Sequence, residues 1–328
     1  MATFELWTFN DLHAEQILIG PLNKNINLLE MELGVKIDHI NNKLLMEEND
    51  SNRKVEPLLK EIISMLSELI EENIAWQERD LIYIIQSFKD SKDFEITHAG
   101  IKNFYINKKI IIHTREGQKV YPKTINQMIY LEAMQKNSII FAKGSAGSGK
   151  TYLAVAFAIS LLKKSQIRKI IITRPVVEAG EKLGFLPGDL KEKVDPYLIP
   201  IYDALYDFLG KEQTERYIEK GTIEIAPLAY MRGRTLDSAV IILDEAQNTT
   251  TNQMKMFVTR LGFNSKMIIT GDITQIDLPN REKSGLIEAT ELLQHLEGVS
   301  IISFNRFDVM RHPLVSKIIS RYEGGTHD

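Results

Sequence analysis

The chain has 328 residues, of which 44% are hydrophobic, enough for two domains or for one large domain with an extension. It contains no cysteine, which excludes disulfides and thiol catalysis. There is no run of about 18 apolar residues and no signal-peptide pattern, so we expect a cytoplasmic protein without a membrane partner. The formal net charge of -4 favours no partner of a single charge sign, and no basic track dominates the sequence.

The amino-terminal part of the chain predicts a small α+β domain. Residues 15–19 have the apolar character of a strand end, and a Gly-Pro turn and a helix follow them. Gly34 is expected to end that helix. Two short strands, 35–40 and 43–47, are then expected to form a hairpin.

A long amphipathic helix is expected next, with Pro57 in its first turn. Residues 89–123 are polar apart from one Ile run, with a turn at Gly117. We interpret this segment as a solvated linker hairpin; a basic strip that contacts phosphates is the alternative. The predicted domains are therefore residues 1–115 and 116–328.

Short strands and helices alternate from residue 124 onward. Each candidate strand is rich in Ile and Val and almost continuously apolar, which is typical of a parallel sheet buried on both faces. We predict an α/β fold with a mostly parallel sheet. The expected strands are 138–142, 169–173, 222–226, 239–243, 266–270 and 299–304.

The stretch "GSAGSGKT" fits the pattern G-x-x-x-x-G-K-[ST], which cradles the phosphates of a nucleoside triphosphate. Its glycines let backbone N–H groups approach the phosphates closely. Lys150 is expected to reach the β- and γ-phosphates, and Thr151 is expected to bind Mg²⁺. The predicted phosphate-binding residues are Gly144, Ser145, Ala146, Gly147, Ser148, Gly149, Lys150 and Thr151.

Asp244 and Glu245 follow another apolar strand, 239–243. A carboxylate at the carboxyl end of a neighbouring strand is where Mg²⁺ lies opposite the P-loop hydroxyl, so Asp244 is predicted to hold the metal. Glu245 is predicted to act as the general base on the attacking water. The two acids favour hydrolysis over transfer to an acceptor, which a kinase would perform with water excluded.

Two glutamines are candidates for sensing the nucleotide. Gln275 lies beyond strand 266–270 and could hydrogen-bond the γ-phosphate or its water, with Asp272 orienting it; a turn with satisfied polar groups is the alternative. Gln127 lies in a helix and could pair with an adenine edge; a surface glutamine is the alternative.

Several basic residues are candidates for contacting phosphate or nucleic acid, since an arginine finger contributes about 10³–10⁵ in rate. A long Gly/Pro-rich loop follows strand 169–173 and carries Arg174 and Lys182, with exposed amides expected at Gly180 and Gly184. A subunit interface is the competing interpretation of that loop. The other candidates are Arg232, Arg234, Arg306 and Arg311.

Several long motifs within about residues 120–322 resemble the PhoH family of phosphate-starvation-inducible ATPases. They are "TRPVVEAGEKLGFLPGDL", "DSAVIILDEAQNTT", "QMKMFVTRLG", "ITGDITQIDLP" and "DVMRH". The family resembles the first RecA-like core of superfamily 1 helicases. The resemblance implies a RecA-like fold, Mg²⁺-dependent ATP hydrolysis, a homo-oligomeric ring and a role in RNA metabolism.

The resemblance also implies roles for individual residues. Lys150, Thr151, Asp244 and Glu245 would form the ATPase centre. The sensor would be Gln275, and the adenine-side glutamine would be Gln127. Arg306 and Arg311 would be intersubunit or γ-phosphate arginines.

The amino-terminal segment resembles a K-homology RNA-binding module, with residues 19–37, "IGPLNKNINLLEMELGVKI", in the place of its I-G-x-x-G-x-x-I pattern. Gly20 stands at the first glycine of its loop, but Asn23 stands where the second belongs, and Pro21 lies between them. That loop normally packs against nucleotide phosphates, so the resemblance implies single-stranded RNA as a partner. An oligomerisation or scaffold role is the alternative.

Together these features predict an ATPase that couples hydrolysis to RNA binding, translocation or unwinding. A complete superfamily 1 motor has two RecA-like lobes, and the resemblance implies only one here, so we expect directed movement to need neighbouring subunits that complete the ATP site. The main alternative is a non-motor switch, an ATP-dependent RNA-binding or ribosome-associated assembly factor. A small-molecule kinase is a less favoured alternative.

Overall fold

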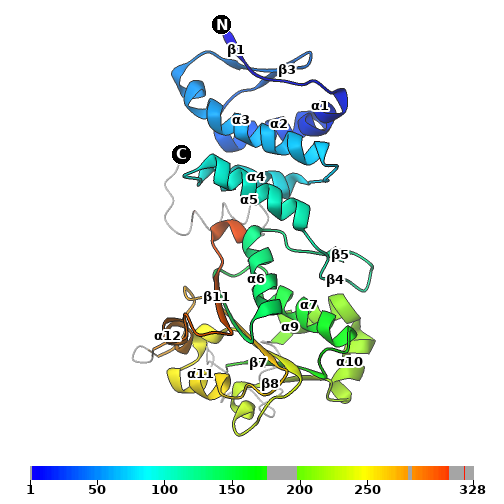
Figure 1. Ribbon diagram of the computed structural model, residues 1–328, viewed down its shortest axis with the longest axis vertical. Helices are drawn as coiled ribbons and strands as arrows, with labels where there is room; N and C mark the ends of the chain where they lie inside the picture. The colour runs from blue at the N-terminus through cyan, green and yellow to red at the C-terminus, as the bar shows by residue number, and fades with distance from the viewer. Residues whose placement is uncertain (1, 176–197, 280–282, 310–320, 322–328) are drawn as a thin grey trace. The chain divides into compact units, whose positions relative to one another are not determined.

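The computed structural model describes residues 2–175, 198–279, 283–309 and 321, and it divides into two compact units, Met1–Lys108 and Lys109–Asp328 (Figure 1). The second unit begins before the hairpin of β4 (Ile112–His113) and β5 (Lys119–Val120), whereas the division expected from the sequence, between residues 115 and 116, falls within that hairpin. The hairpin is held to the second unit because the backbone N–H of Arg115 donates to the carbonyl of Asp207 at 2.8 Å. Gly117 makes its turn, as expected, with φ of 82°.

The first unit is a three-stranded antiparallel sheet, in the order β1-β3-β2, with its helices on one face (Figure 1). Leu6, Leu44 and Met46 of the sheet are at most 2% exposed and contribute to its core. The elements are β1 (Thr3–Thr8), α1 (Leu12–Ile19), α2 (Lys24–Leu33), β2 (Asp38–Ile40), β3 (Lys43–Glu47), α3 (Asp50–Glu71), α4 (Glu78–Lys89) and α5 (Phe94–Asn107).

Three sequence-based expectations for this unit were wrong. Residues 15–19 belong to α1, not to a strand, because Asp11 caps the helix by accepting from Ala14 N. Helix α3 begins at Asp50 and not near Pro57, which lies inside it. Residues 94–107, assigned to a polar linker, form α5, whose apolar side buries Ile101, Phe104 and Tyr105.

The second unit contains a six-stranded sheet in the order β11-β6-β10-β9-β7-β8, and every neighbouring pair is parallel. All six strands predicted from the sequence are present. The sequence interpretation had assumed that the strands leading to Lys150 and to Asp244 are direct neighbours. This was wrong, because β10 lies between β6 and β9. The strands are β6 (Ile139–Lys143), β7 (Lys169–Arg174), β8 (Ile223–Pro227), β9 (Ala239–Leu243), β10 (Lys266–Gly271) and β11 (Val299–Ser303).

Helices cover both faces of this sheet. One core cluster joins it to α6 (Ile125–Lys136), α7 (Lys150–Lys163) and α9 (Ile199–Leu209), and a second joins its other face to α11 (Thr251–Val258) and α12 (Gly285–Leu292). Helix α10 (Lys211–Glu219) follows α9, and short 3₁₀ turns lie at Leu228–Met231, Ala246–Asn248 and Arg306–Asp308. Within the described ranges, no helix is long and apolar enough to cross a membrane.

Candidate nucleotide-binding site

The loop between β6 and α7 has the backbone that a phosphate cradle requires. Gly144, Gly147 and Gly149 have φ of 152°, 87° and 81°, in the region that favours glycine. A Cβ at Gly144 would lie 2.6 Å from Cβ of Phe304, so the close approach of the loop to the chain after β11 also needs glycine. The loop leads directly into α7, whose first N–H groups point toward it.

Lys150 is folded back over this loop. Its ammonium donates to the carbonyls of Gly144 and Ser145 at 2.6 and 2.9 Å and to the hydroxyl of Ser148 at 3.2 Å. The residue is 7% exposed, and burial lowers the pKa of the ammonium below its usual range. The positive charge therefore lies inside the loop, where triphosphate oxygens could replace its present partners.

The Thr151 hydroxyl contacts Asp244, although the strands that precede these two residues, β6 and β9, are not neighbours in the sheet. Thr151 Oγ1 donates to Asp244 Oδ1 at 2.6 Å, and Thr270 Oγ1, at the end of the intervening strand β10, donates to the same oxygen at 2.7 Å. Mg²⁺ prefers few protein oxygens, usually one or two carboxylates together with substrate phosphates and water. The pair Thr151 and Asp244 fits that requirement.

Glu245 has an unusual backbone. Its φ of 53° and ψ of 38° are left-handed, a conformation that costs a non-glycine residue roughly 1 kcal/mol or more and that concentrates at functional sites. Its carboxylate lies 3.5 Å from the Arg174 guanidinium and accepts from Gln247 Nε2 at 2.6 Å. The carboxylate is therefore held from two sides beside Asp244.

Gln247 was missed by the sequence interpretation, although it lies in the quoted stretch "DEAQ". Its side chain is fully buried; Nε2 donates to Glu245 and to the carbonyl of Gln275, and Oε1 accepts from Asp272 N at 3.0 Å. A Cβ at Gly271 would lie 2.8 Å from Oε1, so Gly271 makes room for this contact. Gln247 thus connects the proposed base to the loop after β10.

Asp272 connects that loop to the P-loop. Its Oδ2 accepts from Ala146 N at 3.0 Å and from Gln275 Nε2 at 2.8 Å, while Oδ1 accepts from the backbone and hydroxyl of Thr274. Burial opposes ionisation, but these hydrogen bonds and the charge of Lys150 hold the pKa of Asp272 below its usual value. The predicted orienting contact between Asp272 and Gln275 is present.

This arrangement of loop, hydroxyl and acids is accompanied by similarity along most of the chain. A family model described as PhoH-like protein matches residues 119–323. The chain belongs to this family. A PhoH-like protein of Bacillus subtilis (strain 168) is 51% identical over 306 residues, 93% of each chain. Protein PhoH of Escherichia coli (strain K12) is 46% identical over 211 residues, 64% of this chain and 60% of that protein.

Similarity to solved structures is much weaker. The SWI2/SNF2 ATPase core of Sulfolobus solfataricus in complex with dsDNA has a TM-score of 0.29 and 17% identity, over 44% of this chain and 30% of that one. That likeness is too small to bear on the function. Family membership and site geometry identify a PhoH-like P-loop nucleoside triphosphatase.

Gln127 of the PhoH-like chain is 3% exposed, and both ends of its amide contact protein. Nε2 donates to the carbonyl of Ser148 in the P-loop at 3.0 Å, and Oε1 accepts from Lys123 N at 2.7 Å. In this arrangement the side chain supports the P-loop. Its contact with adenine stays a prediction, and it would require the amide to exchange or share these partners.

The candidate arginines differ in their surroundings. Arg234 forms a bidentate pair with Glu224, at 2.6 and 2.8 Å, which joins the segment before β9 to β8. Arg232 is exposed, and Arg174 lies beside both acids, 4.0 Å from Asp244. The Arg306 side chain, Arg311, Lys182, Gly180 and Gly184 lie outside the described residues.

A buried carboxylate anchors the segment that carries Arg306. Asp308 is 1% exposed and accepts from the hydroxyl of Thr124 at 2.5 Å, from Asn126 Nδ2 at 2.8 Å and from Asn305 N at 2.7 Å. Thr124 in turn caps α6. The chain after β11 is thereby tied to the start of the helix that carries Gln127.

Proposed function

We propose that this PhoH-like protein is a Mg²⁺-dependent ATPase that couples hydrolysis to binding and movement on single-stranded RNA. The observation that carries the proposal is the convergence of Thr151, Asp244 and Glu245. A P-loop hydroxyl and a metal-binding carboxylate touch each other, and a second carboxylate lies next to them in a strained conformation. This is the arrangement expected when water, and not an acceptor group, attacks the γ-phosphate.

The protein side chains then have distinct roles. The amides of the P-loop and the Lys150 ammonium bind the phosphate chain, and Thr151 with Asp244 would hold Mg²⁺. Bound Mg²⁺ neutralises charge that develops on the phosphoryl oxygens. Glu245 takes the proton of the attacking water, and Gln247 keeps the carboxylate aimed at that position through its 2.6 Å hydrogen bond.

The amino-terminal unit supports the RNA part of the proposal. In the loop between α1 and α2, Asn23 has φ of 59° and ψ of 24°, which is the left-handed conformation that a glycine would adopt. Asparagine is one of the non-glycine residues that tolerates this conformation best. Replacement of the second glycine by Asn23 is therefore compatible with a loop that presents its backbone to phosphates.

Assembly into a homo-oligomeric ring is part of the same proposal. The described part of the second unit has one six-stranded parallel sheet with one P-loop, so a motor that works by two walls moving against each other would need the neighbouring copy. The alternative is a non-motor switch. The contact between Ala146 and Asp272 favours it, because bound phosphate would compete for that P-loop amide and so change the loop after β10.

Steady-state ATPase measurements, with and without single-stranded RNA or DNA, on protein of known oligomeric state test the proposal. We expect turnover stimulated by RNA and displacement of a paired strand. Slow, unstimulated turnover with nucleotide-dependent RNA affinity would establish the switch instead. Phosphate transfer to an acceptor with little hydrolysis would contradict both and support a kinase.

A further inference from the structure

A cavity of about 640 Å³ lies in the second unit at the opposite edge of the sheet from the P-loop, where the strands begin. The ends of α6 and α7 and the loops that lead into β7 and β10 enclose it. Its size is within the range of about 300–1,000 Å³ that is typical of ligand pockets. No acidic side chain lines it.

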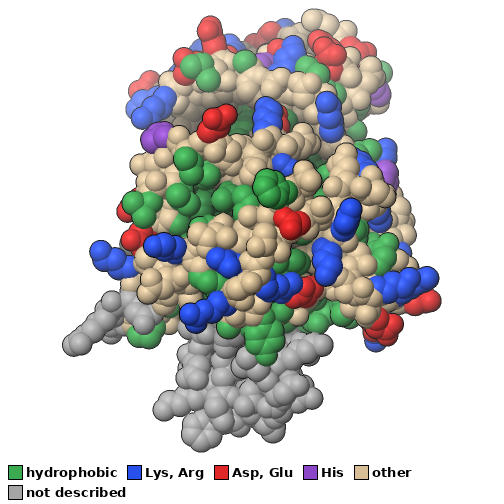
Figure 2. Space-filling model, turned by 60° about the horizontal axis from the view of Figure 1, so that its bottom comes forward, with side chains coloured by type: hydrophobic (Ala, Val, Ile, Leu, Met, Phe, Trp, Pro, Cys, Tyr) green, Lys and Arg blue, Asp and Glu red, His purple; other side chains and the backbone are tan. Residues whose placement is uncertain are grey.

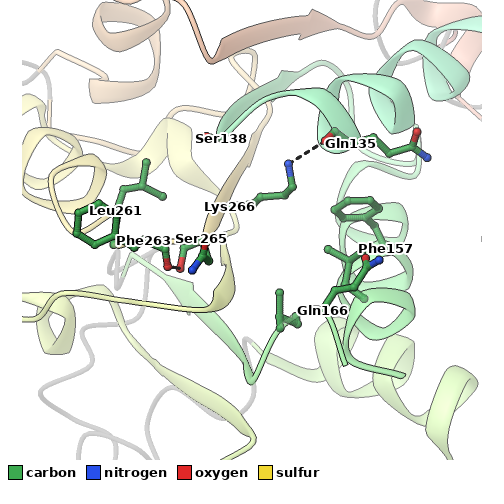
Figure 3. A pocket seen from close by; sticks show the side chains of 12 residues that line it. Gln135, Ser138, Phe157, Gln166, Leu261, Phe263, Ser265 and Lys266 are labelled. Atoms are coloured by element: carbon green, nitrogen blue, oxygen red, sulfur yellow. Dashed lines mark hydrogen bonds between the residues drawn. The ribbon is translucent and has the colours of Figure 1, made fainter. Parts of the chain in front are cut away.

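The lining combines apolar and amide groups. Figure 3 shows Phe157 and Gln166 on one side, Leu261 and Ser265 on the other, and Lys266 between them. Gln166 and Asn264, which also lines the cavity, are exposed, and their side-chain amides make no hydrogen bond to another residue in the described part of the chain, so they face solvent and are accessible to a ligand. Apolar walls with unpaired amides suit a flat heterocycle that has hydrogen-bonding edges, such as a nucleobase.

Lys266 adds a donor to this cavity. Its ammonium donates to the carbonyl of Gln135 at 3.0 Å (Figure 3). It also donates to the carbonyl of Asn137 at 2.7 Å and so caps the end of α6. An ammonium has three N–H donors, so one remains for an acceptor on a ligand. The two carbonyls also fix the direction in which this group points.

An aromatic side chain stands at the rim. Phe263 is 87% exposed, yet its backbone is firmly held: its N–H donates to Asp237 Oδ1 at 2.7 Å, and its carbonyl accepts from Ser238 N at 2.8 Å. Asn264 follows with φ of 57°. A fixed turn therefore presents an aromatic ring to solvent, as in platforms on which bases stack.

The turn between α7 and β7, taken together with the last residue of α7 and the first of β7 (residues 163–169), supplies positive charge next to the cavity. Lys163, Lys164, Arg168 and Lys169 are all exposed, and no acidic residue occurs in this turn. On the face drawn in Figure 2, Lys and Arg side chains lie among acidic and apolar ones. Four cations beside an amide-lined cavity complement a phosphodiester backbone with its bases turned inward.

We propose that this cavity and the 163–169 turn bind single-stranded RNA, with one base in the cavity, a neighbouring base on Phe263 and the phosphates on the turn. The inference rests on the proposed function, because it takes RNA as the polymer on which the ATPase acts. Helix α7 joins the two sites: it begins at Lys150 and ends at Lys163, about 20 Å away. RNA bound at this edge would thus contact the helix whose first turn holds the phosphates.

The test compares the full chain with Phe263→Ala and with the double variant Lys163→Gln and Lys164→Gln. Fluorescence anisotropy with a labelled single-stranded oligoribonucleotide measures affinity. We expect about tenfold weaker binding for Phe263→Ala. For the double variant we expect the slope of log affinity against log salt concentration to fall by the equivalent of about two phosphate contacts. Basal ATPase without RNA should be unchanged in both.

Matched controls are Tyr230→Ala, an exposed aromatic on the same unit, and the pair Lys211→Gln and Lys220→Gln, at the start of α10 and directly after its end. If the unaltered chain binds neither RNA nor DNA, the proposed function itself fails. If the chain binds RNA, but Phe263→Ala and the Lys163/Lys164 double variant bind it as tightly as their controls do, the cavity is not the RNA site. Free mononucleotide that competes as well as the oligonucleotide would assign the cavity to a small molecule and also overturn the proposal.

Discussion

The Thr151 hydroxyl lies 2.6 Å from Asp244 Oδ1, although 93 residues separate the two in the sequence. Thr270 completes the contact from the strand between them, and it donates to the same oxygen. Two hydroxyls, one from the start of α7 and one from the end of β10, thus set the direction of the carboxylate that follows β9. The metal-binding geometry depends on the middle strand as well as on the two motifs.

The hydroxyl of Thr270 is therefore expected to tune metal affinity. In Thr270→Val the shape is kept and the hydrogen bond to Asp244 is lost, so we expect the Mg²⁺ needed for half-maximal ATPase to rise about tenfold. Thr290→Val is the matched control, because among the residues that the structure describes its buried hydroxyl bonds only to the carbonyl of Ile287 in α12. A Mg²⁺ titration that is equal in both variants would remove Thr270 from the metal site.

Glu245 is expected to be essential for turnover but not for binding. Glu245→Gln keeps the contact distance to Gln247 and removes the basic carboxylate, so hydrolysis should slow by about 10²–10⁴-fold. Fluorescent-nucleotide titration should give an affinity for ATP within a few-fold of the original. Unchanged turnover would refute the assignment of Glu245 as the base.

Gln247 is expected to act by positioning Glu245. Gln247→Met conserves volume but removes three hydrogen bonds, so kcat should fall by about 10- to 100-fold with little change in KM. Because the buried N–H of Asp272 loses its acceptor, the free energy of unfolding should also fall by about 1–3 kcal/mol. Gln294→Met, at an exposed position after α12, controls for the substitution itself. A loss of stability without a loss in kcat would show that Gln247 is only structural.

Replacing Asp272 by Asn should raise the affinity for ATP and lower kcat. In Asp272→Asn the charge facing the triphosphate is removed and Ala146 N is less well held, so ATP should bind more tightly. Turnover should fall because Gln275 loses its anchor. Separate measurement of nucleotide affinity and kcat checks this split; parallel losses of both would contradict it.

The lowered pKa of Asp272 also gives a pH dependence. A carboxyl whose pKa is depressed in the folded state stabilises the protein above the pKa of the unfolded chain, and that contribution is lost as the pH falls through the folded value. The stability difference between the original chain and Asp272→Asn should therefore be constant near neutral pH and shrink only below the usual range of aspartate. Urea unfolding at several pH values measures it.

Replacing Gln127 is expected to lower the affinity for ATP and for GTP by the same factor. Gln127→Ala removes the support of Ser148 in the P-loop, so affinity for ATP and GTP should fall by the same few-fold factor. Competition binding with both nucleotides provides the measurement. A loss confined to ATP would instead establish the contact with adenine.

The strands of the larger unit could be predicted because each is buried on both faces, which leaves an almost unbroken run of Ile and Val. Their order could not, since parallel strands are joined by crossovers and sequence neighbours need not pair. The same limit explains why Thr270 was overlooked: its role exists only because β10 lies between β6 and β9. Gln247 was missed because a buried amide has no periodic signal and acquires its function from three partners brought together by folding.

Helices in the smaller unit were harder to predict for local reasons. Residues 12–19 are short and apolar, a pattern that suits a strand or a helix equally, and a single capping contact from Asp11 decides the outcome. Residues 94–107 hide their apolar side among polar neighbours. In both places the deciding information lies outside the pattern of hydrophobic residues.

The buried Asp308 limits how far the chain can be truncated from its carboxyl-terminal end. A shortened version ending at β11 would keep every residue of the phosphate cradle, yet it would strip Thr124 and Asn126 of their shared acceptor at the root of α6. Without that acceptor the start of α6 would be less well ordered, and Gln127 would hold Ser148 of the P-loop less firmly. The resulting loss of ATPase activity could be mistaken for the loss of a catalytic residue. Deletion boundaries should therefore fall beyond this aspartate.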